Sequence, residues 1–228
     1  MVDMVGRTRR SDRRTEALSR ERIVGAAVEL LDATGAGGLT FRALTQRLAT
    51  GPGAIYWHVA NKDELLGAAT EGVVAAALEV DSPGSPREAI RAVALGLFDA
   101  VAAHSWLATQ LAVQLSRAPW GLVAARIFER IGRQVRALGV PERDWFVATS
   151  ALVHYILGAA GQNASNARAP LEVASRAEFL DAVSTAWEGL DPAEFSFTRA
   201  VADQVRGHDD REQFLAGIDF ILTGVMAR

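Results

Sequence analysis

The apolar positions of this chain recur at helical spacing, and residues 19–66 show the pattern most clearly. Ser19 is a suitable N-cap for a first helix, and Gly35 is a suitable end for it. The apolar stripe of this helix consists of Ile23, Ala27, Leu30 and Leu31. Residues three or four positions apart share one face of a helix, so we expect the first helix to support the helices that follow.

A second helix and a very short third helix follow, separated by a strong break. Thr40 can cap the second helix. The apolar face of that helix consists of Phe41, Leu44 and Leu48. Two glycines and a proline at 51–53 end it, whereas Pro52 suits the first turn of a new helix because its missing N–H is not needed there.

The third helix is predicted to turn a row of side chains away from the protein. Ile55 and Val59 are four positions apart and can both pack inward. The side chains left outward are Ala54, Tyr56, Trp57 and His58. Asn61 then begins a fourth helix as its N-cap, with Glu64 three residues later as in a capping box. A short, exposed helix that follows another across a turn containing glycine indicates a helix-turn-helix.

Beyond residue 66 the helical pattern continues, with no alternation typical of strands. The fourth helix is predicted to run to about Leu78, and turn-forming residues at 81–86 end it. Further helices are predicted at 87–103, 106–117, 119–138, 141–163, 176–187 and 211–226. We therefore predict an all-α protein with a flexible basic arm at 1–18, a three-helix helix-turn-helix domain at 19–66 and an all-helical body at 67–228.

Composition limits the classes of protein that the chain can belong to. Its 228 residues include no cysteine, which excludes disulfides and thiolate metal sites and favours a reducing cytoplasm. No apolar run reaches membrane-spanning length and residues 1–14 lack a signal-peptide core, so we expect a cytoplasmic protein with no membrane partner. The net charge is −3, but residues 1–66 carry 10 Lys and Arg against 8 Asp and Glu. The arm can bind phosphates or remain a solvated tail.

Three short strings carry a resemblance to a known family. They are LTFRAL at 39–44, GAIYWHV at 53–59 and NKDELL at 61–66. In this order near the start of the chain they resemble the DNA-binding domain of the tetracycline-repressor-like (TetR) transcription regulators. The resemblance implies a sequence-specific DNA-binding regulator whose all-helical C-terminal domain binds a small molecule and forms a homodimer.

The candidate DNA-binding residues are Thr40, Arg42, Gly53, Ala54, Tyr56, Trp57, His58 and Lys62. Arg42 is the candidate for reading a base, because its guanidinium can donate to both O6 and N7 of guanine; the alternative is a phosphate contact. The three aromatic residues can contact thymine methyl groups and phosphates. Thr40 and Lys62, the only lysine in the chain, match positions at which the family contacts phosphates. The tetracycline repressor has bulkier residues at the positions of Gly53 and Ala54, so a different operator is expected.

Large and polar side chains within apolar surroundings are the candidates for ligand binding. They are Phe98, His104, Gln110, Gln114, Trp120, Phe128, Trp145, His154 and Gln162. Taken singly, each is more often ordinary core or surface. His154 is the first choice, because HYILG at 154–158 resembles the stretch that supplies a pocket histidine in the tetracycline repressor. Gln162 stands where that repressor has an acidic residue, so a hydrophobic or aromatic ligand is expected instead of magnesium-chelated tetracycline.

Small and apolar residues on two of the body helices are the candidates for a dimer interface. They are Gly158, Gly161, Phe214, Gly217, Ile218, Ile221 and Val225. Small residues allow close approach of helices, although both helices can equally serve the core of one chain. The resemblance favours a dimer, because the equivalent helices of the family form a four-helix interface. A two-fold dimer presents its recognition helices to half-sites of a palindromic operator about 34 to 36 Å apart, or a multiple of that distance.

The predicted mechanism is release of a repressor from its operator by a small hydrophobic ligand that binds a different conformation of the body. A ligand acting as co-repressor or activator is the alternative. An enzyme is disfavoured because the chain has no H-E-x-x-H, nucleophile elbow or phosphate-binding glycine loop, so no catalytic residue, metal or cofactor is expected. A third possibility is an adaptor that keeps the fold without reading DNA.

Overall fold

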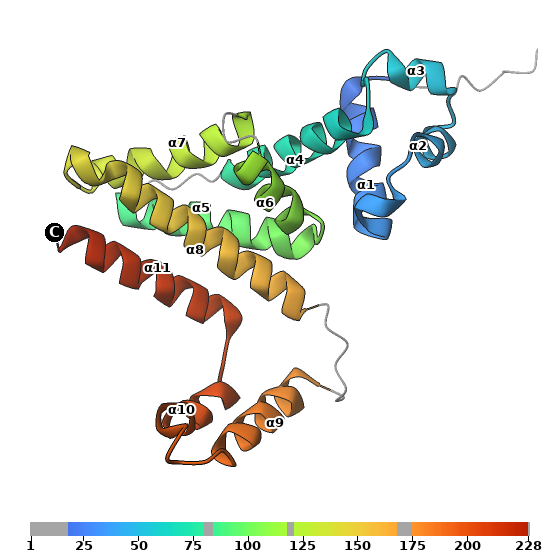
Figure 1. The fold of residues 1–228 in the computed structure, drawn as a ribbon. Helices are drawn as coiled ribbons and strands as arrows, with labels where there is room; N and C mark the ends of the chain where they lie inside the picture. The colour runs from blue at the N-terminus through green and yellow to red at the C-terminus, as the bar shows by residue number, and fades with distance from the viewer. Residues whose placement is uncertain (1–17, 80–83, 118–120, 168–174, 228) are drawn as a thin grey trace, which may run out of the picture.

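The computed structural model describes residues 18–79, 84–117, 121–167 and 175–227. All regular elements within these residues are helical, in agreement with the predicted all-α class (Figure 1). The predicted arm at 1–18 lies outside the described residues, apart from Leu18.

The first four helices form a small head around the predicted helix-turn-helix. They are α1 (Arg20–Gly38), α2 (Phe41–Leu48), α3 (Pro52–Tyr56) and α4 (Lys62–Leu78). The three predicted N-caps are confirmed: Ser19, Thr40 and Asn61 each accept a hydrogen bond from the backbone N–H three residues later, at 3.3, 3.1 and 2.9 Å. Gly35 interrupts α1 with φ 68° and ψ −176°, a conformation that glycine adopts readily, and one more turn follows it.

The body contains seven further α-helices within the described residues. They are α5 (Pro86–Ala103), α6 (Leu107–Arg117), α7 (Leu122–Ala137), α8 (Trp145–Asn166), α9 (Arg176–Glu188), α10 (Ser196–Arg206) and α11 (Asp210–Met226). The prediction at 141–163 is corrected at its start, where a 3-10 turn (Glu142–Asp144) precedes α8. Helix α10 was not predicted, because its inner face is formed by weakly apolar residues such as Ala202.

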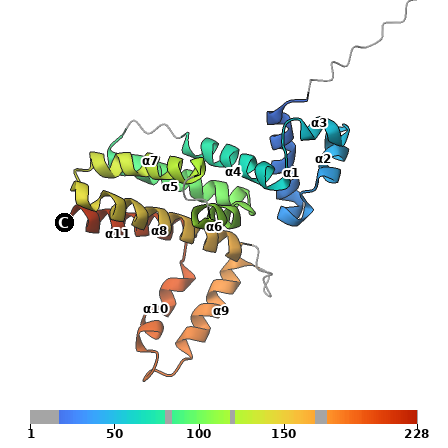
Figure 2. The same ribbon diagram turned by 45° about the horizontal axis from the view of Figure 1, so that its top comes forward.

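The long helix α4 leaves the head and runs into the body, where α5 and α7 pack against it (Figure 1). Helix α8 lies between α5, α7 and α11. Helices α9 and α10 form a hairpin that projects from the body in both views and packs mainly on itself (Figures 1 and 2).

One continuous set of buried apolar side chains joins the head to the body. In the head, Ile23, Leu44 and Ile55 are fully buried. In the body, Ile127 and Ile156 are equally buried. Each such side chain contributes about 1.5 to 3 kcal/mol through removal from water, so packing of the predicted apolar stripes is the main stabilising term.

In the part of the chain that the structure describes, no single helix is long and apolar enough to cross a membrane. Helices α5 and α6 reach that length and composition only together, and the chain bends by 119° between them.

Candidate functional site

The short helix α3 is held on the head by two buried side chains. Ile55 and Val59 are 0% and 1% exposed, as the spacing predicts. Tyr56 stacks on Phe41 of α2, with ring centroids 4.5 Å apart and planes 13° apart. Trp57 is 89% exposed. The head therefore fixes the backbone of α3 and leaves a tryptophan pointing into solvent.

A cluster of hydrogen bonds fixes the end of α3 on the start of α4. The Arg20 guanidinium donates to the carbonyl of His58 and to Oε1 of Glu64, both at 2.7 Å. The predicted capping box is shifted by one residue, because Glu64 Oε2 accepts from the N–H of Ala60 at 2.8 Å. The Ala60 N–H and the Arg20 guanidinium lower the pKa of the Glu64 carboxyl, which keeps this clamp charged.

The remaining DNA-binding candidates differ in their exposure and in whether their polar groups already have a partner within the head. The Arg42 side chain is exposed on α2, and its guanidinium forms no ion pair with any described residue. A Cβ at Gly53 would meet nothing within 4 Å, so the fold does not require glycine there. Ala54 is half-buried on α3. Thr40 uses its oxygen in the cap but keeps its O–H for a partner. Lys62 donates its ammonium to the carbonyl of Ala36 at 2.7 Å, which ties α4 to the end of α1.

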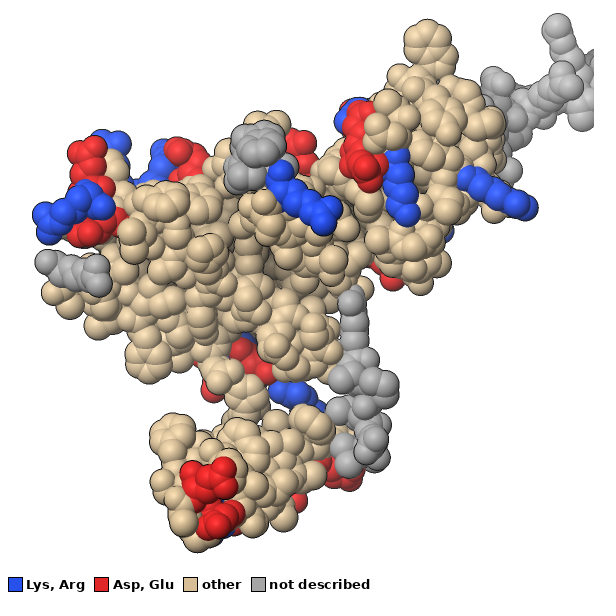
Figure 3. Space-filling view, in the orientation of Figure 1, with Lys and Arg blue, Asp and Glu red and all other residues tan. Residues whose placement is uncertain are grey.

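The described part of the head is electrically balanced. Residues 19–66 carry five basic and five acidic side chains, so the basic excess of residues 1–66 belongs to 1–18. Figure 3 shows uncharged side chains at the tip of the head, where α3 lies, with both basic and acidic side chains below it. The described head therefore offers individually placed charged groups and no net positive charge.

The residues predicted to bind a ligand are spread over several cavities. Phe98 and Gln162 border a cavity of about 120 Å³ between α5, α8 and the start of α11. Phe128 and Trp145 border another of about 280 Å³ between α7 and α8. His104 borders a third, of about 320 Å³, where α1 and α4 of the head meet α5. These five side chains do not converge on one site.

The other ligand candidates border none of the cavities described here. Gln110 and Gln114 are half-buried on α6. His154, the first choice, is exposed on α8, on the same face as Val147. Trp120 lies outside the described residues. The sequence match around residues 154–158 therefore identifies the helix without placing its histidine in an internal pocket.

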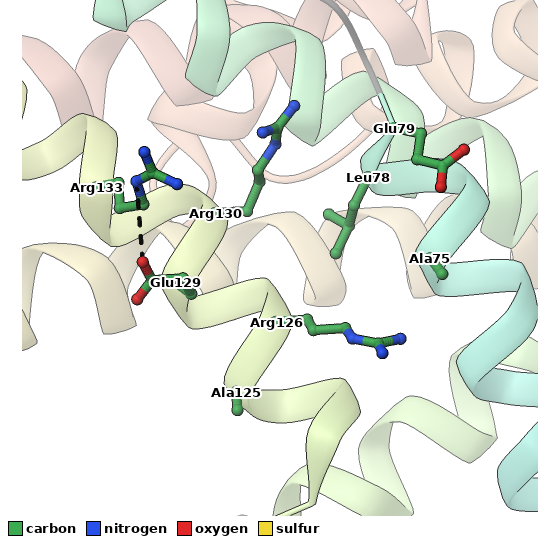
Figure 4. Close-up of a pocket in the computed structure, with 8 residues that line it drawn as sticks. All are labelled: Ala75, Leu78, Glu79, Ala125, Arg126, Glu129, Arg130 and Arg133. Carbon is green, nitrogen blue, oxygen red and sulfur yellow. Dashed lines mark ion pairs between the residues drawn. The ribbon is translucent and has the colours of Figure 1, made fainter.

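A larger groove, which the sequence analysis did not predict, runs between α4 and α7 (Figure 4). Its volume is about 1020 Å³, and it is lined by Ala75, Leu78, Glu79, Ala125, Arg126, Glu129, Arg130 and Arg133. Arg126 pairs with Glu71 at 3.0 Å, and Arg133 with Glu129 at 3.8 Å. Arginines recurring at helical spacing from 126 to 133 were the signal that could have revealed this groove. It is large enough for a small molecule.

The dimer candidates divide into buried and exposed groups. Phe214 and Ile218 are buried within the single chain. Gly217 lies against Tyr155, and Gly161 lies near Ala108, so both small residues serve packing inside one chain.

Gly158 is exposed, whereas Ile221 and Val225 are half-buried beside a cavity of about 260 Å³ between α8 and α11. The outer face of these helices also carries Val147 and Phe220, which are 59% and 79% exposed. The structure shows which faces of the two predicted helices are already covered within one chain, and the dimer interface itself stays a prediction.

Comparison with known proteins agrees with this architecture. Residues 23–69 match the family model of bacterial regulatory proteins of the tetR family, and residues 81–228 match the tetracyclin repressor-like C-terminal domain. An HTH-type transcriptional regulator of Saccharopolyspora erythraea is 31% identical over 153 residues. That match covers 67% of this chain and 64% of the relative, so the chain spans slightly less than two thirds of its length.

Two solved structures extend the comparison to the whole fold. A TetR transcriptional regulator of Streptomyces coelicolor is 71% identical with a TM-score of 0.86, covering 92% of this chain and 99% of that one. ActR, a TetR family protein of the same organism solved in complex with (S)-DNPA, is 26% identical with a TM-score of 0.70, covering 92% and 98%. The chain therefore belongs to the TetR family of bacterial regulatory proteins, and it is a DNA-binding transcription regulator.

Proposed function

We propose that the protein is a homodimeric repressor that binds a palindromic operator and is released from it by a small molecule with a hydrophobic or aromatic part. The observation that carries the DNA-reading role is the geometry of α3. Ile55 and Val59 anchor this helix, while Trp57 is 89% exposed. A large aromatic side chain left in water beside a fixed helix marks a contact surface.

The second copy in this proposal binds through the outer face of α8 and α11. Val147, Ala151 and Gly158 follow one another along the exposed side of α8, and Phe220 is exposed on α11. Apolar side chains in such a row are typical of a surface that another protein covers. A two-fold axis through this face would give the dimer two equivalent heads, one from each chain.

The ligand acts through linkage in this proposal. Helix α4 belongs to the head at Lys62 and borders the body groove at Leu78, so a change in the body can reach the head through one rigid element. A ligand that changes the operator affinity by some factor is itself bound more tightly or more weakly by that same factor when the protein is on DNA. Such a ligand must bind the body better in one arrangement of the heads than in the other. A ligand that lowers the operator affinity releases the repressor, whereas a ligand that raises it acts as a co-repressor.

The DNA-reading role is tested by titrating the protein onto the DNA upstream of its own gene and onto scrambled DNA, across a series of salt concentrations. Arg42→Ala is expected to weaken binding to the specific DNA by about 1 to 3 kcal/mol and to leave the weak binding to scrambled DNA unchanged. Arg117→Ala, an exposed arginine on α6, is the matched control and should bind as the wild type does. Equal binding of both DNAs, unaffected by either change, would refute the assignment for that site.

The assembly is tested by sedimentation of the wild type and of Phe220→Glu. The charge is expected to shift the protein toward monomer, because it places an unpaired carboxylate in the proposed interface. Leu122→Glu, at an equally apolar and exposed position on α7, should stay dimeric. A monomeric wild type, or a dimer that tolerates the charge at residue 220, would contradict this interface.

A further inference from the structure

One carboxylate of the head makes two side-chain contacts with the body. Asp32 Oδ1, on α1, accepts a hydrogen bond from the indole Nε1 of Trp106 at 2.7 Å. The same oxygen lies 2.9 Å from Nδ1 of His104. These partners are 74 and 72 residues away in the sequence, so the contact joins the DNA-reading head to the body directly.

The two donors, His104 and Trp106, lie at the corner where α5 ends and α6 begins. His104 ends α5 with its N–H bonded to the carbonyl of Ala100 at 2.8 Å, and its own carbonyl accepts from the N–H of Leu107 at 2.8 Å. Trp106 is buried, with 5% exposed. The chain bends by 119° between α5 and α6 at this point, and the buried Trp106 fixes the corner against the body core.

The position of Asp32 is not explained by the stability of α1 itself. It lies one turn before the break at Gly35, and the last turn of α1 contains no basic residue. A negative charge near the C-terminal end of a helix is unfavourable, because the unpaired carbonyls there are also negative. The contacts with His104 and Trp106 supply the compensating donors.

The rest of this junction is loosely filled. The cavity of about 320 Å³ beside the contact is lined on the head side by Val24 and Val28 of α1 and by small residues of α4. On the body side it is lined by Gly96 and Ala100 of α5. Small side chains interlock little, so packing across this cavity restrains the head less than the buried core around α4 does.

We propose that Asp32 is a positioning residue that sets the inclination of the head on the body through His104 and Trp106. Asp32 does not touch DNA in this role; it decides which separation of half-sites the two heads can reach together. The inference rests on the proposed dimeric repressor, and it adds a second connection between head and body beside α4.

The test is the dependence of operator affinity on half-site spacing. One inserted base pair moves a half-site by about 3.4 Å and rotates it by about 34° around the duplex. The wild type is expected to discriminate against operators with one base pair added or removed by at least about fivefold. Asp32→Ala should reduce this discrimination to less than twofold, because a loosened head reaches all three spacings.

The matched control is Glu29→Ala, on the same helix. Glu29 is also exposed and pairs with Arg47 of α2, inside the head, so its loss removes an ion pair without touching the body. It should keep the discrimination of the wild type. His104→Ala removes one of the two contacts and should fall between the wild type and Asp32→Ala, and the double variant should go no further than Asp32→Ala. Discrimination that survives in Asp32→Ala, or that is lost equally in Glu29→Ala, would overturn the proposal.

A measurement without DNA separates this proposal from the proposed function. Because the chain has no cysteine, Gln46→Cys on α2 and Thr109→Cys on α6 can carry a pair of spin labels, diluted with unlabelled protein. The distribution of distances between them should broaden in Asp32→Ala and stay narrow in Glu29→Ala. An unchanged distribution would refute the positioning role, whereas broadening in a protein that binds no operator would leave that role standing and refute the repressor assignment.

Discussion

Replacing Gly217 by alanine is expected to destabilise the protein, because Tyr155 occupies the space that a side chain would need. A Cβ at residue 217 would lie 1.9 Å from the Tyr155 hydroxyl oxygen and 2.2 Å from the ring carbon Cζ. The ring of Tyr155 stacks on Phe214, with centroids 5.9 Å apart and planes 12° apart, and its hydroxyl donates to the Phe214 carbonyl at 3.2 Å. The ring or α11 must therefore move.

The magnitude follows from what Tyr155 loses by moving. Its hydrogen bond contributes about 0.5 to 1.5 kcal/mol, and its contact with Phe214 contributes about 0.5 to 1.5 kcal/mol. Residual strain in a filled core adds about 1 to 3 kcal/mol if the ring stays close. The better helix propensity of alanine offsets about 1 kcal/mol. With the strain included, these terms give a net loss of about 1 to 5 kcal/mol, which lowers the melting temperature by at least about 2 °C for a chain of this length.

Calorimetry at one fixed protein concentration measures this change, because association shifts apparent stability. Gly72→Ala in the middle of α4 is the control: a Cβ there meets nothing within 4 Å, so it should raise stability by up to about 1 kcal/mol. In a Tyr155→Ala background, Gly217→Ala should cost much less than in the wild type. If Gly217→Ala instead stabilises as Gly72→Ala does, the close approach of α8 and α11 at Tyr155 is wrong.

Three further outcomes are expected. Trp57→Ala should leave the free energy of unfolding within about 0.5 kcal/mol of the wild type, since its side chain is exposed. The same change should lower operator affinity about tenfold in an anisotropy titration, and unchanged affinity would remove Trp57 from the DNA contact. Ser184→Ala leaves the Ala202 carbonyl without its buried donor at 2.7 Å, which should weaken the hairpin by about 1 to 3 kcal/mol and speed amide exchange in α9 and α10, with unaltered exchange as the contrary result. The Arg91 guanidinium holds the pKa of the Asp219 carboxyl below its usual range. The ionised Asp219 carboxylate therefore stabilises the fold fully above about pH 4, and this contribution is lost as the pH falls below that value. Asp219→Asn should flatten the fall of the melting temperature below about pH 4, and an identical acid limb would contradict this reasoning.

Local signals in the sequence predicted the head well. Ser19, Thr40 and Asn61 cap their helices because each interaction spans three residues. Ile55 and Val59 are buried together because a four-residue interval fixes their common face. These predictions need no knowledge of contacts between residues far apart in the sequence, and all of them are confirmed.

The body was less predictable because its sites depend on how helices cross. The periodicity of α8 does not show that His154 faces outward, since that depends on where α5, α7 and α11 pack. Gly217 has its nearest neighbour at Tyr155, on another helix, and His104 contacts Asp32 across 72 residues. Pairings over such distances are absent from a periodic pattern, so the sequence placed the candidate residues on helices without showing which residues they contact.

The α9–α10 hairpin is the part of the molecule that best tolerates inserted sequence. Its inner face is small, with Leu180, Ser184 and Ala202 as its buried residues, and an ion pair between Arg176 and Asp210 at 2.6 Å links it to the start of α11. The turn between the two helices is exposed and far from the head (Figure 2). Exposed tips that carry little of a core accept inserted sequence most readily. This turn is therefore the place to graft a fluorescent reporter or an affinity tag while keeping the DNA-reading end of the protein unaltered.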